Sequence, residues 1–288
     1  MSVPPSLVVR GHRLLPIVQG GMGVGVSAHR LAGAVASAGG MGTIASIDLR
    51  HHHPDLLEAT RHCRDHEELN RVNRIALDRE IRAALASAEG RGLVAVNVMK
   101  AVADHAALVR QACASGAQAI VMGAGLPLDL PDLAEGHPEV ALIPILSDAR
   151  GVAIVLKKWA KKGRLPDAIV IEHPRYAGGH LGAPKPEDIG DARFDFSRAL
   201  PEILKVFDEQ GIARDRIPLI AAGGIHTPEQ VRDLLALGAS AVQLGTPFAV
   251  SEEGDAAPEF KRVLAEAKPE DIVTFMSVAG LPARAVNT

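Results

Sequence analysis

The chain has 288 residues, of which 47% are hydrophobic and 3% aromatic, and its formal net charge is −3. This composition excludes a largely disordered chain, and the mixed charges give no reason to expect a nucleic-acid or membrane-surface partner. Neither Cys63 nor Cys113 belongs to a Cys-x-x-Cys pair, so we expect no disulfide framework and no zinc ribbon. No secretory signal and no apolar stretch of spanning length is present, which favours a cytoplasmic protein.

Short apolar runs alternate with segments of helical periodicity along the chain. The predicted strands are 15–20, 41–46, 93–98, 119–122, 140–146, 168–171, 217–222 and 241–244, and the predicted helices are 28–38, 67–89, 104–115, 149–162, 196–210, 228–237 and 257–267. Eight strands alternating with helices predict an α/β fold, a closed (β/α)₈ TIM barrel, with an open doubly wound sheet as the alternative. The barrel is favoured because the first and last strands both end in glycine-rich loops, and only closure makes these strands neighbours.

We expect a single domain over residues 1–288. The long helix at about 67–89 and the C-terminal segment at about 255–288 are the parts expected to form a small accessory region. The longest loop after a strand covers residues 177–193 and is rich in glycine, proline and charge. Long loops are often functional, and this one would lie over the mouth of the barrel.

The strongest chemical signal is a phosphate site after the last two strands. Strand 217–222 runs into Gly223 and Gly224, and strand 241–244 runs into Gly245 and Thr246. Glycines allow a phosphate to approach the backbone closely, where free N–H groups bind its oxygens. Barrels commonly place phosphate at these two loops, so this order favours phosphate binding over simple tight turns.

Three further features would share that mouth. Gly20, Gly21 and Met22 follow the first strand, where a flat ring could lie against the backbone, although a plain flexible loop has the same composition. His180 stands among glycines in the long loop and is suited to acid–base work, but is equally typical of an exposed loop histidine. The amide of Asn97 offers a donor and an acceptor, and also suits a strand end that bonds only to backbone.

We expect no metal site. His51, His52 and His53 have no accompanying carboxylate or cysteine pattern of recognised spacing, so a polar surface loop is the better interpretation.

Four motifs in this order resemble the nitronate monooxygenase family: PIVQGGMG at 16–23, AGGHLG at 177–182, IAAGGI at 220–225 and QLGTPF at 243–248. The resemblance extends from about residue 16 to about residue 284. It implies an FMN-dependent barrel without metal that oxidises alkyl nitronates, such as propionate 3-nitronate, with molecular oxygen. A small-molecule substrate and oxygen are then the partners, and a homodimer is compatible with the family.

The resemblance also implies roles for particular residues. Gly223, Gly224, Gly245 and Thr246 would hold the FMN phosphate. Gly20, Gly21 and Met22 would lie against one face of the flavin ring, and Asn97 would lie near the ring's polar edge. Gly178 and Gly179 would line the cofactor. His180 would act as the base. Ser147 and Glu172, at the ends of the fifth and sixth strands, are placed near the same site.

Two other functions stay open at this point. The resemblance extends to NAD(P)H-dependent flavin reductases, of the enoyl-acyl-carrier-protein reductase or NADH:quinone reductase type. A barrel that binds a phosphorylated metabolite without flavin is an alternative of another class, but it leaves residues 20–23 and His180 without a shared purpose.

Overall fold

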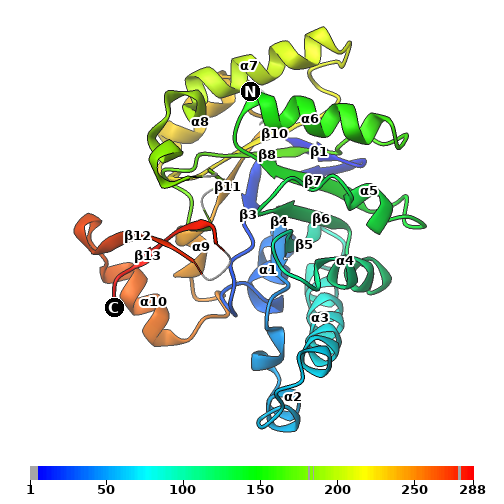
Figure 1. The fold of residues 1–288 in the computed structure, drawn as a ribbon, viewed down its shortest axis with the longest axis vertical. Helices are drawn as coiled ribbons and strands as arrows, with labels where there is room; N and C mark the ends of the chain where they lie inside the picture. The colour runs from blue at the N-terminus through cyan, green and yellow to red at the C-terminus, as the bar shows by residue number, and fades with distance from the viewer. Residues whose placement is uncertain (1–5, 181, 184, 278–279) are drawn as a thin grey trace.

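A computed structural model describes residues 6–180, 182–183, 185–277 and 280–288 of the chain. Its centre is a closed barrel of strands in the order β10-β11-β3-β4-β5-β6-β7-β8 (Figure 1). Every neighbouring pair of these strands is parallel. The strands are β3 (Ile17–Gln19), β4 (Met41–Ala45), β5 (Leu93–Met99), β6 (Ala119–Gly123), β7 (Ala141–Leu146), β8 (Ile169–Glu172), β10 (Leu219–Ala222) and β11 (Ala241–Leu244). The predicted (β/α)₈ barrel is therefore confirmed, and the open sheet is wrong.

Helices surround the barrel (Figure 1). The longer ones are α1 (His29–Ser37), α3 (His66–Ala88), α4 (His105–Ala114), α6 (Ala149–Ala160), α7 (Phe196–Glu209), α8 (Pro228–Ala236) and α10 (Pro258–Glu266). Shorter helical pieces are α2 (Pro54–Ala59), α5 (Leu130–Leu133), α9 (Thr246–Ala249), η1 (Leu49–His52), η2 (Pro186–Gly190), η3 (Ala192–Phe194) and η4 (Pro269–Asp271). The periodic helices lie within a few residues of their predicted bounds, and all of the longer ones except α10 bury apolar residues.

The hydrophobic core has two parts, one inside the barrel and one between barrel and helices. On β8, Val170 belongs to the inner cluster, whereas Ile169 and Ile171 belong to the outer one. Successive side chains of a strand point to opposite faces, so a residue's neighbours identify its side of the barrel wall. This alternation fixes which strand-end residues face the mouth.

A short hairpin that the sequence did not predict closes the N-terminal end of the barrel. Strands β1 (Leu7–Val9) and β2 (His12–Leu14) pair antiparallel, and Leu7, Val9 and Leu14 join the inner cluster. The hairpin thus fills the barrel at the N-terminal ends of its strands, which leaves the C-terminal ends as the open side.

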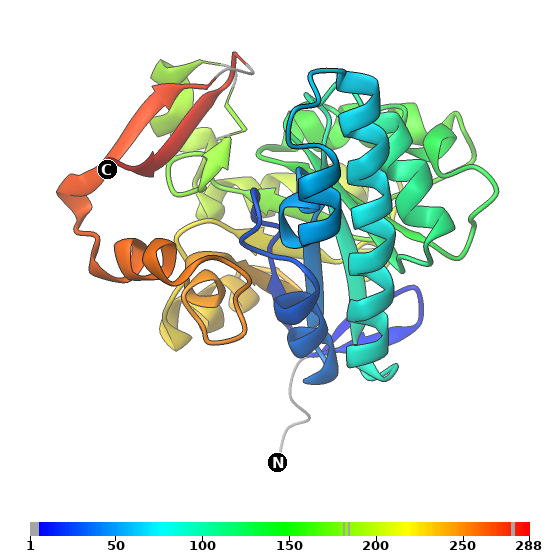
Figure 2. The ribbon, with the colours of Figure 1, turned by 90° about the horizontal axis from the view of Figure 1, so that it is seen from below.

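A second sheet stands beside the barrel. Strands β12 (Ile272–Met276) and β13 (Pro282–Val286) form a hairpin, and β13 also pairs with the two-residue strand β9 (Gly179–His180). In Figure 2 the red hairpin lies next to the yellow-green segment that contains the long loop. The chain's last strand therefore touches the loop expected to lie over the mouth.

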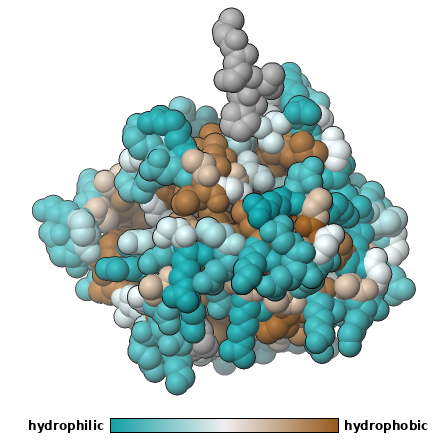
Figure 3. Space-filling view, turned by 90° about the horizontal axis from the view of Figure 1, so that it is seen from above, coloured by the Kyte–Doolittle hydropathy of each residue, from teal (hydrophilic) through white to brown (hydrophobic). Residues whose placement is uncertain are grey.

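On the face that Figure 3 shows, hydrophilic residues predominate and hydrophobic residues form smaller patches among them. Among the described residues, none of the helices combines the length and apolar character needed to cross a bilayer.

Candidate functional site at the C-terminal ends of the strands

The two loops predicted to bind phosphate emerge side by side. Ala222 of β10 is the register partner of Gln243 of β11, so Gly224 and Gly245 follow at equivalent positions on adjacent strands. The φ angle of Gly224 is +71°, a conformation that favours glycine. Within the part of the chain that the structure describes, the amides of Gly224, Gly245 and Thr246 donate no hydrogen bond. Three N–H donors are thus free at one point of the mouth.

The glycine loop after β3 packs against the same strand ends. The amide of Gly20 donates to the carbonyl of Leu244 at 3.0 Å. A Cβ atom built on Gly20 would lie 3.1 Å from Cδ of Gln243, and one built on Gly245 would lie 3.5 Å from Sδ of Met22. The loops after the first and last strands of the barrel are therefore neighbours, as barrel closure requires.

Asn97 occupies the other side of this loop. It follows Ala95, an inner-cluster residue two positions earlier on β5, so its side chain faces the inside of the barrel. A Cβ atom on Gly21 would lie only 2.3 Å from Cβ of Asn97, so no larger residue fits at position 21 without a shift. Asn97 and Gly21 are therefore in close contact.

The segment that carries His180 is held by the C-terminal strand. The register pairs His180 with Ala283 and Gly179 with Arg284, and it is the backbone of β9 that the structure describes. The Arg284 guanidinium also donates to the carbonyl of Arg175 at 3.3 Å. Gly178 is exposed, and a Cβ atom built on it would meet no other atom within 4 Å. This sheet, rather than the barrel, sets the position of the predicted base.

Sequence reasoning missed the turn that packs on the glycine loop after β10. His173 is 5% exposed and its ring bonds to Asp195 at 3.2 Å. Tyr176 packs on Gly224, where a Cβ atom would lie 2.9 Å from the Cβ of the tyrosine. The aromatic contacts of His173 with Tyr176 and Phe196 hold the turn in place. The His-Pro-Arg-Tyr run at 173–176 was the available signal, but its partners are distant in sequence.

The N-terminus of α1 is already satisfied by carboxylates, although it follows the glycine loop. Asp255 accepts hydrogen bonds from the amides of Ala28 and Leu31 at 2.8 and 3.1 Å, and Glu80 accepts from the amide of His29 at 2.7 Å. An anion such as phosphate would meet two negative charges here. The free amides after β10 and β11 are the better phosphate site.

Glu80 is a buried acid that binds two histidines. It is 1% exposed, and its oxygens lie 2.7 Å from Nδ1 of His29 and 2.9 Å from Nε2 of His53. Burial by itself raises the pKa of Glu80, but hydrogen bonds from His29 hold it below its ordinary value. The same hydrogen bond raises the pKa of His29.

The histidines at 51–53 are not all exposed. Nε2 of His52 lies close to Gly25, 2.9 Å from the place where a Cβ atom on that glycine would stand. Residues 51–53 lie in the predicted polar segment at the surface, but His52 and His53 are half-buried there, against Gly25 and Glu80.

Replacing Glu80 by glutamine is expected to lower the free energy of unfolding by about 2 kcal/mol, because a charged, buried acceptor is lost. The lowered pKa of Glu80 stabilises the fold above about pH 4.5, and the raised pKa of His29 stabilises it below about pH 6.5. The loss of unfolding free energy in Glu80→Gln should therefore be largest between about pH 4.5 and pH 6.5 and smaller on either side. Urea unfolding of both proteins at several pH values measures this difference. Glu68→Gln, at an exposed glutamate of the same helix, is the control and should change little; an equal loss there would contradict the prediction.

No group of three or more histidine, cysteine or acidic side chains within the described residues is arranged to hold a metal ion.

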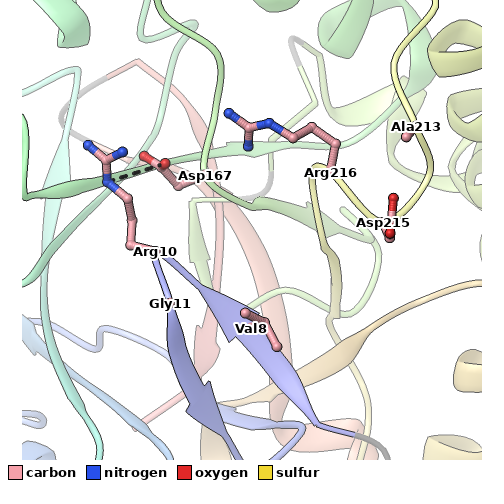
Figure 4. Close-up of a pocket in the computed structure, with 7 residues that line it drawn as sticks. All are labelled: Val8, Arg10, Gly11, Asp167, Ala213, Asp215 and Arg216. Atoms are coloured by element: carbon pink, nitrogen blue, oxygen red, sulfur yellow. Dashed lines mark ion pairs between the residues drawn. The ribbon is translucent and has the colours of Figure 1, made fainter.

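A cavity of about 460 Å³ lies at the opposite end of the barrel (Figure 4). Its lining residues are Val8, Arg10, Gly11, Asp167, Ala213, Asp215 and Arg216, which belong to the β1–β2 turn and to the segments before β8 and β10. Arg10 and Arg164 both pair with Asp167 there, at 3.5 and 3.0 Å. None of the predicted site residues lines this cavity, and barrels build their active sites at the other face. We therefore place the candidate site at the C-terminal strand ends.

The fold defines the class of this protein, a (β/α)₈ barrel, and its candidate site lies at the C-terminal face. The sequence profile of the family described as nitronate monooxygenase matches residues 12–288. The chain belongs to the nitronate monooxygenase family, a family of oxidoreductases.

Curated relatives match a shorter part of the chain. A nitronate monooxygenase of Pseudomonas aeruginosa is 36% identical over 118 residues, which cover 41% of this chain and 31% of that protein. A probable nitronate monooxygenase of Staphylococcus saprophyticus is 30% identical over 124 residues, covering 41% of this chain and 32% of that protein. The matched segment thus spans about a third of these relatives' length.

Two solved structures have the same fold. FabK from Thermotoga maritima has a TM-score of 0.66 and 24% identity, covering 95% of this chain and 71% of that chain. A nitroalkane oxidase from Streptomyces ansochromogenes has a TM-score of 0.67 and 24% identity, covering 94% and 76%. At this identity the likeness shows the fold alone.

Proposed function

We propose that this protein uses FMN to oxidise alkyl nitronates, such as propionate 3-nitronate, with molecular oxygen. The observation that carries the proposal is the set of three free amide donors at Gly224, Gly245 and Thr246, on neighbouring strand ends, in a chain that belongs to the nitronate monooxygenase family. A phosphate monoester needs such donors, and the open face of the barrel supplies them in one place.

The residues present fit FMN. Its phosphate would bind the free amides together with Gly223, and Gly20, Gly21 and Met22 would support one face of the ring. The close contact of Gly21 with Asn97 supports this assignment, because it brings an amide side chain to the edge of the glycine surface. Gly178 and Gly179 would line the opposite side, where no side chain of the described residues fills the space over Gly178.

When bound, FMN supplies the electron-accepting chemistry. The protein binds and orients the nitronate and limits access of water. His180 removes the α-proton when the substrate arrives as a neutral nitroalkane, because an imidazole has a pKa near neutrality. The β9–β13 pairing supports this role, since it fixes the backbone of His180 to a second strand.

An anaerobic absorbance scan of the purified protein tests the proposal. Propionate 3-nitronate should bleach a bound flavin spectrum, and NADH should leave it unchanged. Bleaching by NADH or NADPH alone would replace the proposal with a flavin reductase. A protein that never takes up FMN would leave only a barrel that binds a phosphorylated metabolite.

A further inference from the structure

Glu172 is an acidic residue on the inner wall of the barrel mouth. It ends β8 two positions after Val170, which lies in the inner cluster, and its register partner Ala222 lies in that cluster too. Ile171, which lies between Val170 and Glu172 on β8, faces the outer cluster. By strand alternation the carboxyl therefore faces the inside of the mouth.

Glu172 is one of two polar side chains that flank a small residue. The register runs from Glu172 on β8 through Ala222 on β10 to Gln243 on β11. Neighbouring strands are about 4.8 Å apart, so the two polar residues stand roughly 10 Å from each other, with only a methyl group between them. Gln243 also borders Gly20. A ligand group that lies over Ala222 is within reach of both side chains.

The carboxyl of Glu172 has no hydrogen-bond or ion-pair partner among the described residues, and neither has the amide of Gln243. Burial raises the pKa of Glu172 to about 7. The neighbouring charged groups are engaged elsewhere: the His173 ring contacts Asp195, and Asp148 of the loop after β7 accepts from the amide of Gly151 and lies 4.0 Å from Arg193. Arg175 is exposed, and the inward-facing Asn97 and Gln243 are uncharged. A carboxyl in this setting is about half protonated near pH 7, where an ordinary glutamate is almost wholly ionised.

We propose that Glu172, in its protonated form, donates a hydrogen bond to the nitro oxygens of the bound nitronate, with Gln243 as the second donor. The inference rests on the proposed function and adds the group that recognises the anion. A neutral acid donates to an anionic oxygen, whereas a carboxylate at the same place repels it. Loss of the proton from Glu172 therefore weakens substrate binding at alkaline pH.

The pH dependence of KM for propionate 3-nitronate tests this donor. For the unaltered protein KM should rise by about tenfold per pH unit above pH 7, once Glu172 ionises. For Glu172→Gln, whose amide donates at every pH, KM should stay flat from pH 6 to 9, with FMN content unchanged. Glu187→Gln, at an exposed acid in the segment that follows β8, is the control and should keep the unaltered profile. Parallel profiles for the unaltered protein and Glu172→Gln would overturn the proposal.

A second measurement needs neither substrate nor cofactor. In flavin-free protein, a folded-state pKa raised above the unfolded value stabilises the fold at low pH, and this contribution is lost as pH rises toward the folded pKa. The ratio of the folding constants of Glu172→Gln and the unaltered protein should therefore grow by about tenfold per pH unit between pH 5 and 7. A constant ratio would show that Glu172 ionises normally and would overturn the proposal. A growing ratio in a protein that oxidises no nitronate would instead reject the proposed function, and with it the nitronate as the partner of Glu172.

Discussion

Replacing His180 by alanine is expected to slow the oxidation of 3-nitropropionate, whose nitroalkane carbon still carries its α-proton, by about 10²- to 10⁴-fold, while propionate 3-nitronate is oxidised at nearly the unaltered rate. The two compounds differ by the α-proton, so the comparison isolates proton removal. A neutral nitroalkane must lose that proton before it can give up electrons, whereas the nitronate has already lost it. Values of kcat/KM for both compounds, with FMN content measured in each preparation, give the ratio.

Two controls separate a chemical role of His180 from a structural one. His137→Ala removes an exposed histidine paired with Glu139, far from the mouth in the fold, and should change neither rate. His180→Gln keeps a polar side chain on β9 but provides no base, so it should resemble the alanine variant. Equal losses on the two substrates would mean that His180 binds or positions substrate and is not the base.

The barrel itself was predictable because its signals are local. Each strand is a short apolar run, and each long helix has an apolar stripe with period 3.6, so both were visible in single segments. The meeting of the loops at Gly20 and Gly245 followed from barrel closure alone. The contact of Gly21 with Asn97 was implied only by the resemblance, since nothing in the spacing of the two residues indicates that they touch.

The second sheet was not predictable in the same way. Strand β9 has two residues, too few for any periodicity, and its partner β13 lies at the other end of the chain. Pairing of distant short strands depends on tertiary structure that a sequence window does not contain. The position of His180 was therefore beyond sequence reasoning, although its residue type was not.

The buried acid Glu80 was missed for a different reason. Glu80 falls four residues after Ala76 and three after Leu77, on the apolar stripe of α3, and this position is a signal that could have identified it. A helix is predicted from the period of its apolar residues alone, so a charged residue on the buried face is not identified by that pattern. His53, its partner, lies in a segment without periodicity, so the pair became visible only in three dimensions.

Replacing Gly245 by aspartate is expected to abolish FMN binding without unfolding the barrel. Gly245 has a φ angle of −111°, which other residues adopt, and a Cβ atom there meets only Sδ of Met22, at 3.5 Å. The fold therefore tolerates a side chain at this position. A carboxylate placed about 4 Å from a phosphate repels it by about 4 kcal/mol per pair of unit charges at the protein surface, or about a thousandfold in Kd.

Asparagine and alanine at the same position divide this effect into charge and size. Gly245→Asn has the volume of aspartate without its charge, so it should weaken FMN binding less than Gly245→Asp does. Gly245→Ala adds one methyl group and should weaken it least. Flavin titration of the three apoproteins, followed by fluorescence, gives the Kd values, and circular dichroism confirms that each barrel is folded. If Gly245→Asp bound FMN as tightly as the unaltered protein, the phosphate would not lie at β10 and β11, and the free amides of Gly224 and Thr246 would need another ligand.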